Sequence, residues 1–377
     1  MRAINIDELR SLARRRLPRA VFEFIDGGAQ DEDTLRANSE DFRRLRFLTR
    51  VLTDVSNIDQ SVELYGRRYD SPLVLAPTGL AGLLWRHGEL AAVRAAHRRN
   101  VPYCLSTMAT CSIEDIAEEG NAPNWFQLYV LRDRGLTRAF IERARAARCS
   151  ALVLTVDTKR QGPRERDIRN GFTVPPRFGL STLVDFARHW RWLFNVGLGP
   201  RITFRNFAGT AAHSDSAVTI TQFIAGQYDL SVGWKDVDWF KAQWGGPVLV
   251  KGILSPEDAR LAVSHGLDGI IVSNHGGRQL DGATSAIAAL PAVADAVGGS
   301  VPVLLDGGIR RGCDEVKACA LGASACMLRN AWVYEIALVG ERGGTDALQI
   351  LHDEIELALA LLGRPSLGEL GTDCLTG

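Results

Sequence analysis

The stretch Gly269-Ile270-Ile271-Val272-Ser273-Asn274-His275-Gly276-Gly277 shows the pattern on which this sequence is built. Its β-branched residues are typical of a buried strand, and the polar residues and glycines that follow indicate where that strand ends. Seven other short apolar runs end in a similar way, and most are followed by a segment with helical spacing. The eight runs cover residues 73–76, 103–105, 125–129, 151–156, 247–250, 269–272, 302–305 and 325–328.

Apolar strands that alternate with helices predict a parallel sheet covered on both faces. Eight such units favour a closed TIM barrel, because the glycine fingerprint Gly-x-Gly-x-x-Gly of an open dinucleotide-binding sheet is missing. We therefore predict an α/β fold with a single domain over residues 1–377, a (β/α)8 TIM barrel. An N-terminal helical extension precedes it, since Met1–Arg19 has the spacing of an amphipathic helix.

The starts of the runs lie 22 to 33 residues apart, except that 96 residues separate the fourth from the fifth. We interpret residues of about 159–232 as a long insertion after strand 4, a position where barrels carry lids over their sites. Residues 186–194 of this lid are rich in Arg, Trp and Phe. Two interpretations stay open for them: peripheral contact with a membrane surface, or a helix that packs its tryptophans on the barrel or on a neighbouring subunit.

The composition excludes several classes of function. Lys and Arg together number 44, as do Asp and Glu, so no basic field is present to attract nucleic acid. Seven cysteines without zinc-ligand spacing predict free thiols, no metal site and a cytoplasmic protein. No segment reaches the roughly 20 apolar residues of a membrane-spanning helix, so membrane contact would be peripheral, at the inner face of the plasma membrane.

Hydrogen-bonding or ionisable side chains stand at the end of every predicted strand. In a TIM barrel these ends meet at one face, where the chemistry takes place. A ring of such groups suits a polar ligand better than packing does. The residues concerned are Thr78, Ser106, Gln127, Tyr129, Thr155, Asp157, Lys251, Ser273, His275, Asp306 and Arg329.

The loop from Ser273 to Asp281 carries the sharpest chemical signal. His275 offers an imidazole, a group that can act as an acid or a base, while Arg278 can bind a carboxylate through two parallel hydrogen bonds. The glycines between them allow the backbone to approach a ligand closely.

This loop resembles the signature of the FMN-dependent α-hydroxy-acid dehydrogenase and oxidase family, within which the bacterial L-lactate and mandelate dehydrogenases are the most similar subgroups. The resemblance extends from Ile6 to about Ser366. Further landmarks are Leu17-Pro18, Gly27-Gly28-Ala29, Ala76-Pro77-Thr78-Gly79, Trp125-Phe126-Gln127-Leu128-Tyr129, Thr155-Val156-Asp157, Lys251-Gly252 and Leu305-Asp306-Gly307-Gly308-Ile309-Arg310.

The resemblance implies FMN as the cofactor and assigns residues to it. Lys251, one of five lysines against 39 arginines, would place a compact positive charge beside flavin N1 and O2. The remaining cofactor-binding residues implied are Pro77, Thr78, Gly79, Ser106, Gln127, Thr155, Ser273, Asp306, Gly307, Gly308, Arg310, Arg329 and Asn330.

The resemblance also implies how the substrate is held and oxidised. Arg164 and Arg278 would bind the carboxylate of a 2-hydroxy acid, and Tyr129 would donate a hydrogen bond near the substrate oxygen. His275 would take the hydroxyl proton, and Asp157 would stabilise the imidazolium that forms.

Three positions depart from the usual family pattern. Phe24 stands where most members carry a Tyr that helps to bind the substrate carboxylate. Arg329-Asn330 replaces a Gly-Arg pair at the cofactor phosphate, so that the Arg either turns toward the phosphate from its new place or leaves this contact weakened. Met108 replaces a bulky Trp of some members and indicates an adaptable substrate pocket.

We therefore expect oxidation of a lactate- or mandelate-like L-2-hydroxy acid to the 2-oxo acid, with electrons passed to a quinone or another carrier. Two alternatives stay open: an oxidase that uses O2 and releases H2O2, and a flavin- or anion-binding protein that has lost turnover. The family resemblance also implies a homotetramer.

Overall fold

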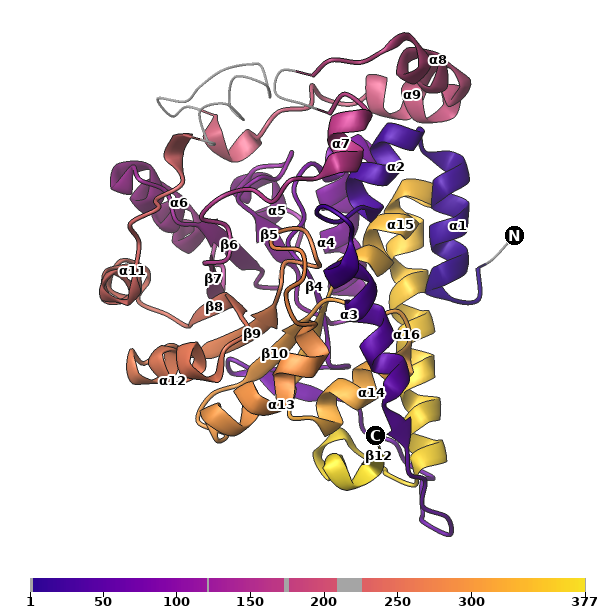
Figure 1. The fold of residues 1–377 in the computed structure, drawn as a ribbon, viewed down its shortest axis with the longest axis vertical. Helices are drawn as coiled ribbons and strands as arrows, with labels where there is room; N and C mark the ends of the chain where they lie inside the picture. The colour runs from indigo at the N-terminus through magenta and orange to yellow at the C-terminus, as the bar shows by residue number, and fades with distance from the viewer. Residues whose placement is uncertain (1–2, 121, 173–175, 209–225, 377) are drawn as a thin grey trace.

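Eight parallel strands form the centre of the molecule, and they are the eight that the sequence predicts (Figure 1). The computed structural model describes residues 3–120, 122–172, 176–208 and 226–376. In this part of the chain the sheet order is β4-β11-β10-β9-β8-β7-β6-β5, and a parallel bridge between Leu75 and Tyr103 joins β4 to β5 and closes the ring. The strands are β4 (Leu73–Leu75), β5 (Cys104–Ser106), β6 (Trp125–Tyr129), β7 (Ala151–Thr155), β8 (Val248–Ile253), β9 (Gly269–Ser273), β10 (Val303–Asp306) and β11 (Ala325–Leu328).

A layer of helices surrounds the barrel, because each strand is followed by a segment whose apolar face packs on the sheet. Ser255 illustrates the local signal: its hydroxyl caps a helix that begins with Pro256. The outer helices are α4 (Gly88–Arg98), α5 (Ile113–Ala117), α6 (Arg134–Ala146), α11 (Val237–Trp244), α12 (Pro256–Ser264), α13 (Ala286–Val297), α14 (Gly312–Ala320), α15 (Asn330–Val339) and α16 (Glu341–Leu362).

The barrel interior is packed with side chains. Inward-facing residues of all eight strands, including Trp125, Leu249 and Met327, form one buried cluster. A hairpin of β2 (Val62–Leu64) and β3 (Arg67–Tyr69) contributes Leu64 and Tyr69 to that cluster. Because this hairpin covers the amino ends of the strands, the carboxyl ends at the opposite face are left for a site.

The N-terminal extension consists of α1 (Ile6–Arg16), α2 (Arg19–Asp26) and α3 (Asp33–Arg44). The predicted helix over Met1–Arg19 is therefore shorter than expected at both ends. Asn5 caps its start, and it stops before Leu17 because the residue ahead of a proline disfavours helical backbone angles. The extension then crosses to the mouth of the barrel, and β1 (Arg46–Phe47) pairs with the C-terminal β12 (Leu375–Thr376).

The lid follows β7, the fourth strand of the barrel, as predicted. Its described helices are α7 (Glu165–Arg169), α8 (Leu180–Arg188) and α9 (Trp190–Gly197), and residues 173–175 and 209–225 of the predicted insertion lie outside the described residues. Figure 1 shows these helices beside α2, above the carboxyl ends of the strands. The backbone N–H of Arg19 donates to Asp185 at 2.7 Å and so links α2 to α8. No helix in the described ranges is both long enough and apolar enough to cross a bilayer.

Candidate active site

A cavity of about 730 Å³ lies at the carboxyl ends of the barrel strands. Nearly all of the site residues predicted from the sequence line it. The two exceptions, Asp157 and Ser273, are hydrogen-bonded to His275 and Lys251, which do line it. The cavity is lined by Phe24, Pro77, Thr78, Gly79, Ser106, Met108, Gln127, Tyr129, Thr155, Arg164, Lys251, His275, Arg278, Asp306, Gly307, Gly308, Arg310, Arg329 and Asn330.

His275 and Asp157 form an acid/base pair at one wall of this cavity. Nδ1 of His275 lies 3.0 Å from Oδ1 of Asp157, so the second ring nitrogen, Nε2, is left for a ligand. The backbone of His275 is in the left-handed region, with φ of 59°, and its N–H donates to Ser273 Oγ at 3.0 Å. Such a conformation is uncommon for a residue other than glycine, and in functional sites it serves to aim a side chain.

The carboxylate of Asp157 is held in its charged form. Burial by itself would raise the pKa of Asp157, but the neighbouring His275 ring and the Lys251 ammonium bring it below its ordinary value. Asp157 can therefore stabilise a positive charge that appears on His275. Tyr129, which faces the same groups, has a pKa raised to about 12 by burial and by Asp157, so it remains a hydroxyl donor.

Lys251 supplies a buried positive charge at the centre of the barrel mouth. Its Nζ lies 2.8 Å from Ser273 Oγ and 2.5 Å from Asp306 Oδ2, and its side chain is 5% exposed. Although burial opposes the charge, Asp306 and then Asp157 raise the pKa of Lys251 above its ordinary value. The ammonium therefore stays protonated in a region of low dielectric, where it acts strongly on a neighbouring ligand.

A row of polar side chains follows the ends of β5, β6 and β7. Ser106 donates to Gln127 Oε1 at 3.2 Å, and Gln127 Nε2 donates to Thr155 Oγ1 at 2.9 Å. This row offers both donors and acceptors to the edge of a planar heterocycle.

Two arginines, Arg164 and Arg278, also line the cavity. Arg278 is buried, and its Nη1 donates to the carbonyl oxygen of Gly27 at 2.6 Å. Arg164 has a buried Nε without a hydrogen-bond partner among the described residues, and its Nη1 lies 3.8 Å from Asp167. Burial, together with Arg164 and Arg329, lowers the pKa of Arg278 well below its ordinary value. An anion in this part of the cavity would relieve that repulsion.

Phe24, the first departure from the family pattern, lies at the wall of the cavity, as the family resemblance implies. Its ring stacks on Phe172 with a centroid separation of 5.7 Å, and the Arg278 guanidinium lies over it at 5.7 Å. The ring therefore orients Arg278 through a cation–π contact and offers it no hydrogen bond.

Arg329, the second departure, turns toward α2. Its Nη1 donates to the carbonyl oxygen of Ile25 at 2.7 Å and to Asn330 Oδ1 at 3.1 Å. Burial lowers the pKa of Arg329 to about 10. The guanidinium is therefore held on the end of α2, and its relation to the cofactor phosphate stays a prediction.

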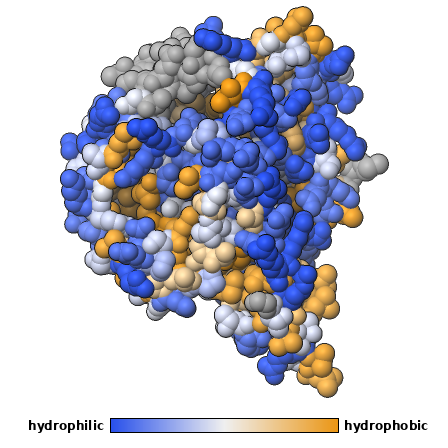
Figure 2. All heavy atoms as spheres, in the orientation of Figure 1, coloured by the Kyte–Doolittle hydropathy of each residue, from blue (hydrophilic) through white to orange (hydrophobic). Residues whose placement is uncertain are grey.

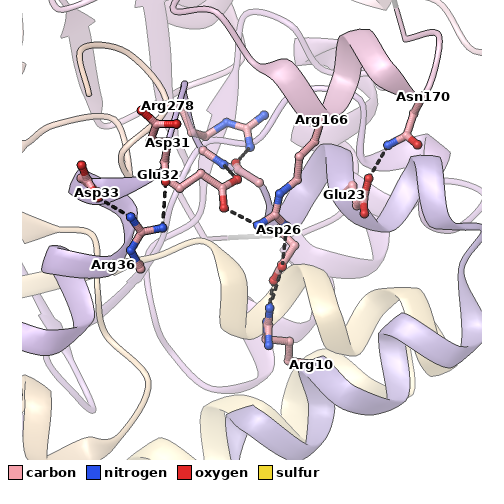
Figure 3. Close-up of polar contacts among 12 residues, drawn as sticks. Arg10, Glu23, Asp26, Asp31, Glu32, Asp33, Arg36, Arg166, Asn170 and Arg278 are labelled. Carbon is pink, nitrogen blue, oxygen red and sulfur yellow. Dashed lines mark hydrogen bonds and ion pairs between the residues drawn. The ribbon is translucent and has the colours of Figure 1, made fainter. Parts of the chain in front are cut away.

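A network of ion pairs fixes the lid on α2 (Figure 3). Arg166 of α7 pairs with Glu32, whose carboxylate also accepts the N–H of Gly28 at 2.9 Å. Arg166 also lies 3.7 Å from Asp26, which Arg10 holds through two hydrogen bonds of 2.6 and 2.7 Å. Because α7 begins directly after Arg164, this network determines where Arg164 enters the cavity.

Several residues of the site are missed by the sequence reasoning. Asn38 of α3 exchanges hydrogen bonds with Asn274 at 2.9 and 2.8 Å, and Asp167 and Tyr228 line the cavity. Tyr228 meets Tyr129 edge to face at 5.9 Å. A polar residue in mid-helix, such as Asn38, carries no local signal for this role. Asp167 could have been found, since it lies three residues after Arg164 and thus on the same side of a helix.

Comparison with known proteins agrees with this geometry. A family model for FMN-dependent dehydrogenases matches residues 13–377. The chain belongs to the FMN-dependent dehydrogenase family. An L-lactate dehydrogenase from Alcaligenes faecalis is 43% identical and is matched over 98% of this chain and 97% of that protein. Among solved structures, a monotopic membrane protein, (S)-mandelate dehydrogenase, has a TM-score of 0.95 at 38% identity with full coverage of both chains. A mandelate oxidase has a TM-score of 0.86 at 37% identity, covering 99% of this chain and 98% of that one.

The cofactor of an FMN-dependent dehydrogenase is FMN, and the residues of this cavity fit it. Lys251 and the polar row from Ser106 to Thr155 match the hydrogen-bonding edge of an isoalloxazine. The loop at Gly307 and Gly308, with φ of 115° and 87°, and the nearby start of α15 provide backbone N–H groups suited to a phosphate. Within the described residues, no group of three or more His, Cys, Asp and Glu side chains is placed to hold a metal ion.

Gly308 provides a test of the cofactor loop. A Cβ on Gly308 would lie 2.0 Å from the carbonyl oxygen of Asn38, so Gly308→Ala must push the loop away from α3. We expect this variant to weaken FMN binding about tenfold or more, since such overpacking costs on the order of 1–3 kcal/mol. Equilibrium dialysis or quenching of flavin fluorescence measures the Kd.

The matched control is Gly282→Ala, where φ is also positive at 80° but nothing lies within 4 Å of the added Cβ. This variant carries the same backbone strain without the close contact. Equal FMN affinity in the two variants would contradict the assignment of the Gly308 loop to the cofactor.

Proposed function

We propose that this FMN-dependent dehydrogenase oxidises an L-2-hydroxy acid, lactate- or mandelate-like in its reacting group, to the 2-oxo acid. The observation that carries the proposal is the convergence of His275–Asp157, Arg164 and Arg278 on one cavity together with Lys251. A base, a carboxylate clamp and a cofactor site are the three parts that such an oxidation requires. FMN, when bound, accepts the two electrons that the alcohol loses.

Each side chain then has a separate task. Arg164 and Arg278 bind the substrate carboxylate through charged hydrogen bonds and fix its orientation. Tyr129 donates a hydrogen bond to the substrate oxygen. His275 Nε2 accepts the hydroxyl proton as the α-hydrogen leaves, and Asp157 stabilises the resulting imidazolium.

The charge of Lys251 completes this arrangement. A fixed ammonium close to the cofactor favours the uptake of electrons, because it stabilises negative charge on the ring system. Asp306 and Ser273 hold the ammonium in place and would not need to move during the reaction. The cofactor would contact three parts of the cavity: the Pro77–Gly79 segment, the polar row and the Gly307–Arg310 loop. The side of the cavity near Arg278 is then left for the substrate.

We propose a quinone or another carrier as the electron acceptor and peripheral contact with a membrane through residues 186–194. Trp192 packs inward, with its indole N–H donating to Leu83 at 2.7 Å, but its neighbours on α8 and α9 face outward. Figure 2 shows the resulting apolar area at the upper right, where Figure 1 places these helices. The exposed residues are Leu180, Leu183, Val184, Trp190, Leu193, Phe194 and Leu198.

This apolar surface supports a location at the inner face of the plasma membrane, where a lipid-soluble acceptor is available. Arg188 and Arg191 belong to the same two helices, so cationic side chains accompany the aromatic ones, as is usual at a membrane interface. We also propose a homotetramer as the assembly; light scattering of the purified protein measures its mass.

The reaction predicts a stereospecific optical change. Under anaerobic conditions an L-2-hydroxy acid should bleach the bound flavin, and its D-enantiomer should not, because the clamp, base and cofactor address one face of the α-carbon. His275→Ala should keep the flavin bound and lower the rate of bleaching by about 10²-fold or more. A stopped-flow spectrophotometer follows both changes. Equal bleaching by both enantiomers, or an unchanged rate in His275→Ala, would refute the assignment.

The position of Phe24 at the cavity wall predicts that residue 24 influences the preference for small or large substrates. Phe24→Tyr adds a donor beside Arg278, and one hydrogen bond to a charged group contributes about 1.5–3 kcal/mol. We expect kcat/KM for glycolate and L-lactate to rise by up to about tenfold, and that for L-mandelate to rise less, since aryl acids already gain from apolar burial against Phe24. An unchanged preference, or a shift toward the larger acid, would show that residue 24 does not face the substrate.

The outward-facing residues predict membrane binding. The double variant Trp190→Ser, Phe194→Ser should float less well than the parent with liposomes that contain anionic lipids, because each change removes a large apolar side chain from the interface. Leu361→Ser on α16, also exposed at 66%, is the matched control. If the double variant floats as well as the Leu361→Ser control, the membrane contact does not lie at residues 186–194.

A further inference from the structure

The two strongest departures of this chain from its family pattern meet at one place, the C-terminal end of α2. Phe24 lies in the last turn of that helix, and the carbonyl of the next residue, Ile25, accepts a hydrogen bond from Arg329 at 2.7 Å. Two residues farther on, the carbonyl of Gly27 accepts one from Arg278 at 2.6 Å. Two guanidinium groups are therefore held on a single short segment of backbone.

Arg329 thus places a third guanidinium beside those of Arg164 and Arg278 in the cavity. The family usually has a glycine at this position, which provides no side chain at all. Burial and the charge of Arg164 lower the pKa of Arg329. The charge of Arg329 in turn lowers the pKa of Arg278. All three groups therefore share one electrostatic environment.

The carboxylates nearby are already engaged with other cations. Asp26 is held by Arg10 at 2.6 and 2.7 Å, and Asp306 by Lys251 at 2.5 Å. In the part of the chain that the structure describes, Arg278 and Arg329 make no ion pair within 4 Å. Their observed hydrogen bonds go to neutral acceptors, the carbonyls of Gly27 and Ile25 and, for Arg329, the Asn330 amide.

Among the described residues two carboxylates line the cavity: Asp306, which Lys251 holds, and Asp167, which lies beside Arg164. Oδ2 of Asp167 lies 3.8 Å from Arg164 Nη1. With Asp167 charged, the three arginines leave two positive charges unbalanced. One substrate carboxylate would balance the first, and the second would remain in a buried site, where an unpaired charge is costly.

The cofactor phosphate is the other anion that could balance the positive charge of Arg329, but the conformation of the Arg329 side chain argues against this role. The guanidinium is turned to α2, on the side of Phe24 and Arg278. The backbone of Gly307 and Gly308 and the start of α15 offer donors for a phosphate without the Arg329 side chain.

We propose that the preferred substrate is an L-2-hydroxy acid with a second carboxylate on its side chain, the first carboxylate bound by Arg164 and Arg278 and the second by Arg329. This inference rests on the proposed function and narrows its substrate class. Arg329 is then a specificity-determining residue, because it contacts a part of the substrate that does not react.

A matched pair of acids tests the proposal. (S)-2-Hydroxyglutarate and (S)-2-hydroxypentanoate have the same number of carbon atoms and differ in the terminal carboxylate. With the FMN-loaded parent protein we expect kcat/KM for the diacid to exceed that for the monoacid by about tenfold or more, the effect of one charged hydrogen bond. Anaerobic reduction of the flavin, followed by absorbance, gives the rates without any assumption about the acceptor.

Variants of Arg329 test whether its positive charge causes the preference for the diacid over the monoacid. Arg329→Met should lower kcat/KM for the diacid about tenfold more than kcat/KM for the monoacid, mainly through KM. Arg329→Lys should keep part of the preference, since it retains the charge. Arg68→Met, an exposed change on β3 far from the cavity mouth, should leave both values unchanged. The Kd for FMN is measured for every protein.

The outcomes separate the possible errors. A parent protein that reduces its flavin with the monoacid at least as well as with the diacid overturns this inference and leaves the proposed function intact. The inference is also overturned if Arg329→Met binds FMN more weakly but keeps the preference for the diacid over the monoacid. Arg329 would then bind the FMN phosphate and not the substrate. If neither these acids nor L-lactate or L-mandelate reduces the flavin of the parent, the proposed function itself fails. Should Arg329→Met not fold, the parent ratio and Arg329→Lys still decide.

Discussion

The closure of eight parallel strands into a ring is the constraint on which the rest of this structure depends. The last strand of the barrel, β11, pairs with the first, β4, and the bridge between Leu75 and Tyr103 joins β4 to the second strand. Closure removes both sheet edges, and it brings the carboxyl ends of all eight strands to one mouth. Residues from Thr78 to Arg329, about 250 positions apart in the chain, can meet in one cavity only for this reason.

Buried charge is the second organising feature. Among the described residues the cavity is lined by Lys251, Arg164, Arg278, Arg310 and Arg329. Lys251 has a close carboxylate partner, Asp306 at 2.5 Å, and Arg164 has a more distant one, Asp167 at 3.8 Å. Taking cations out of water is unfavourable unless anions accompany them. A protein that stays folded with this excess is prepared for anionic ligands, and the phosphate of FMN and the carboxylate of a hydroxy acid are both of that kind.

The N-terminal extension has a structural part in the site. α2 supplies Phe24 to the wall of the cavity and backbone carbonyls to Arg278 and Arg329, while Asp26 and Glu32 hold the lid through Arg166 (Figure 3). The arginine side chains are long and flexible, and each loses rotamer freedom when it is fixed. Contacts to a helix end that the barrel and the lid already position reduce that cost at the moment of substrate binding.

The sequence by itself determined the eight strands and the lid after the fourth of them, because these follow from local periodicity and spacing, and the family resemblance implied the pairing of His275 with Asp157. It also indicated that Phe24 and Arg329 are unusual. Only the tertiary structure decided that these two departures lie together, and that Asn38, Asp167 and Tyr228 belong to the same cavity. The direction of a side chain such as Arg329 depends on which distant carbonyl accepts its hydrogen bond. That partner, Ile25, is 304 residues away in the chain and becomes a neighbour only when the barrel closes.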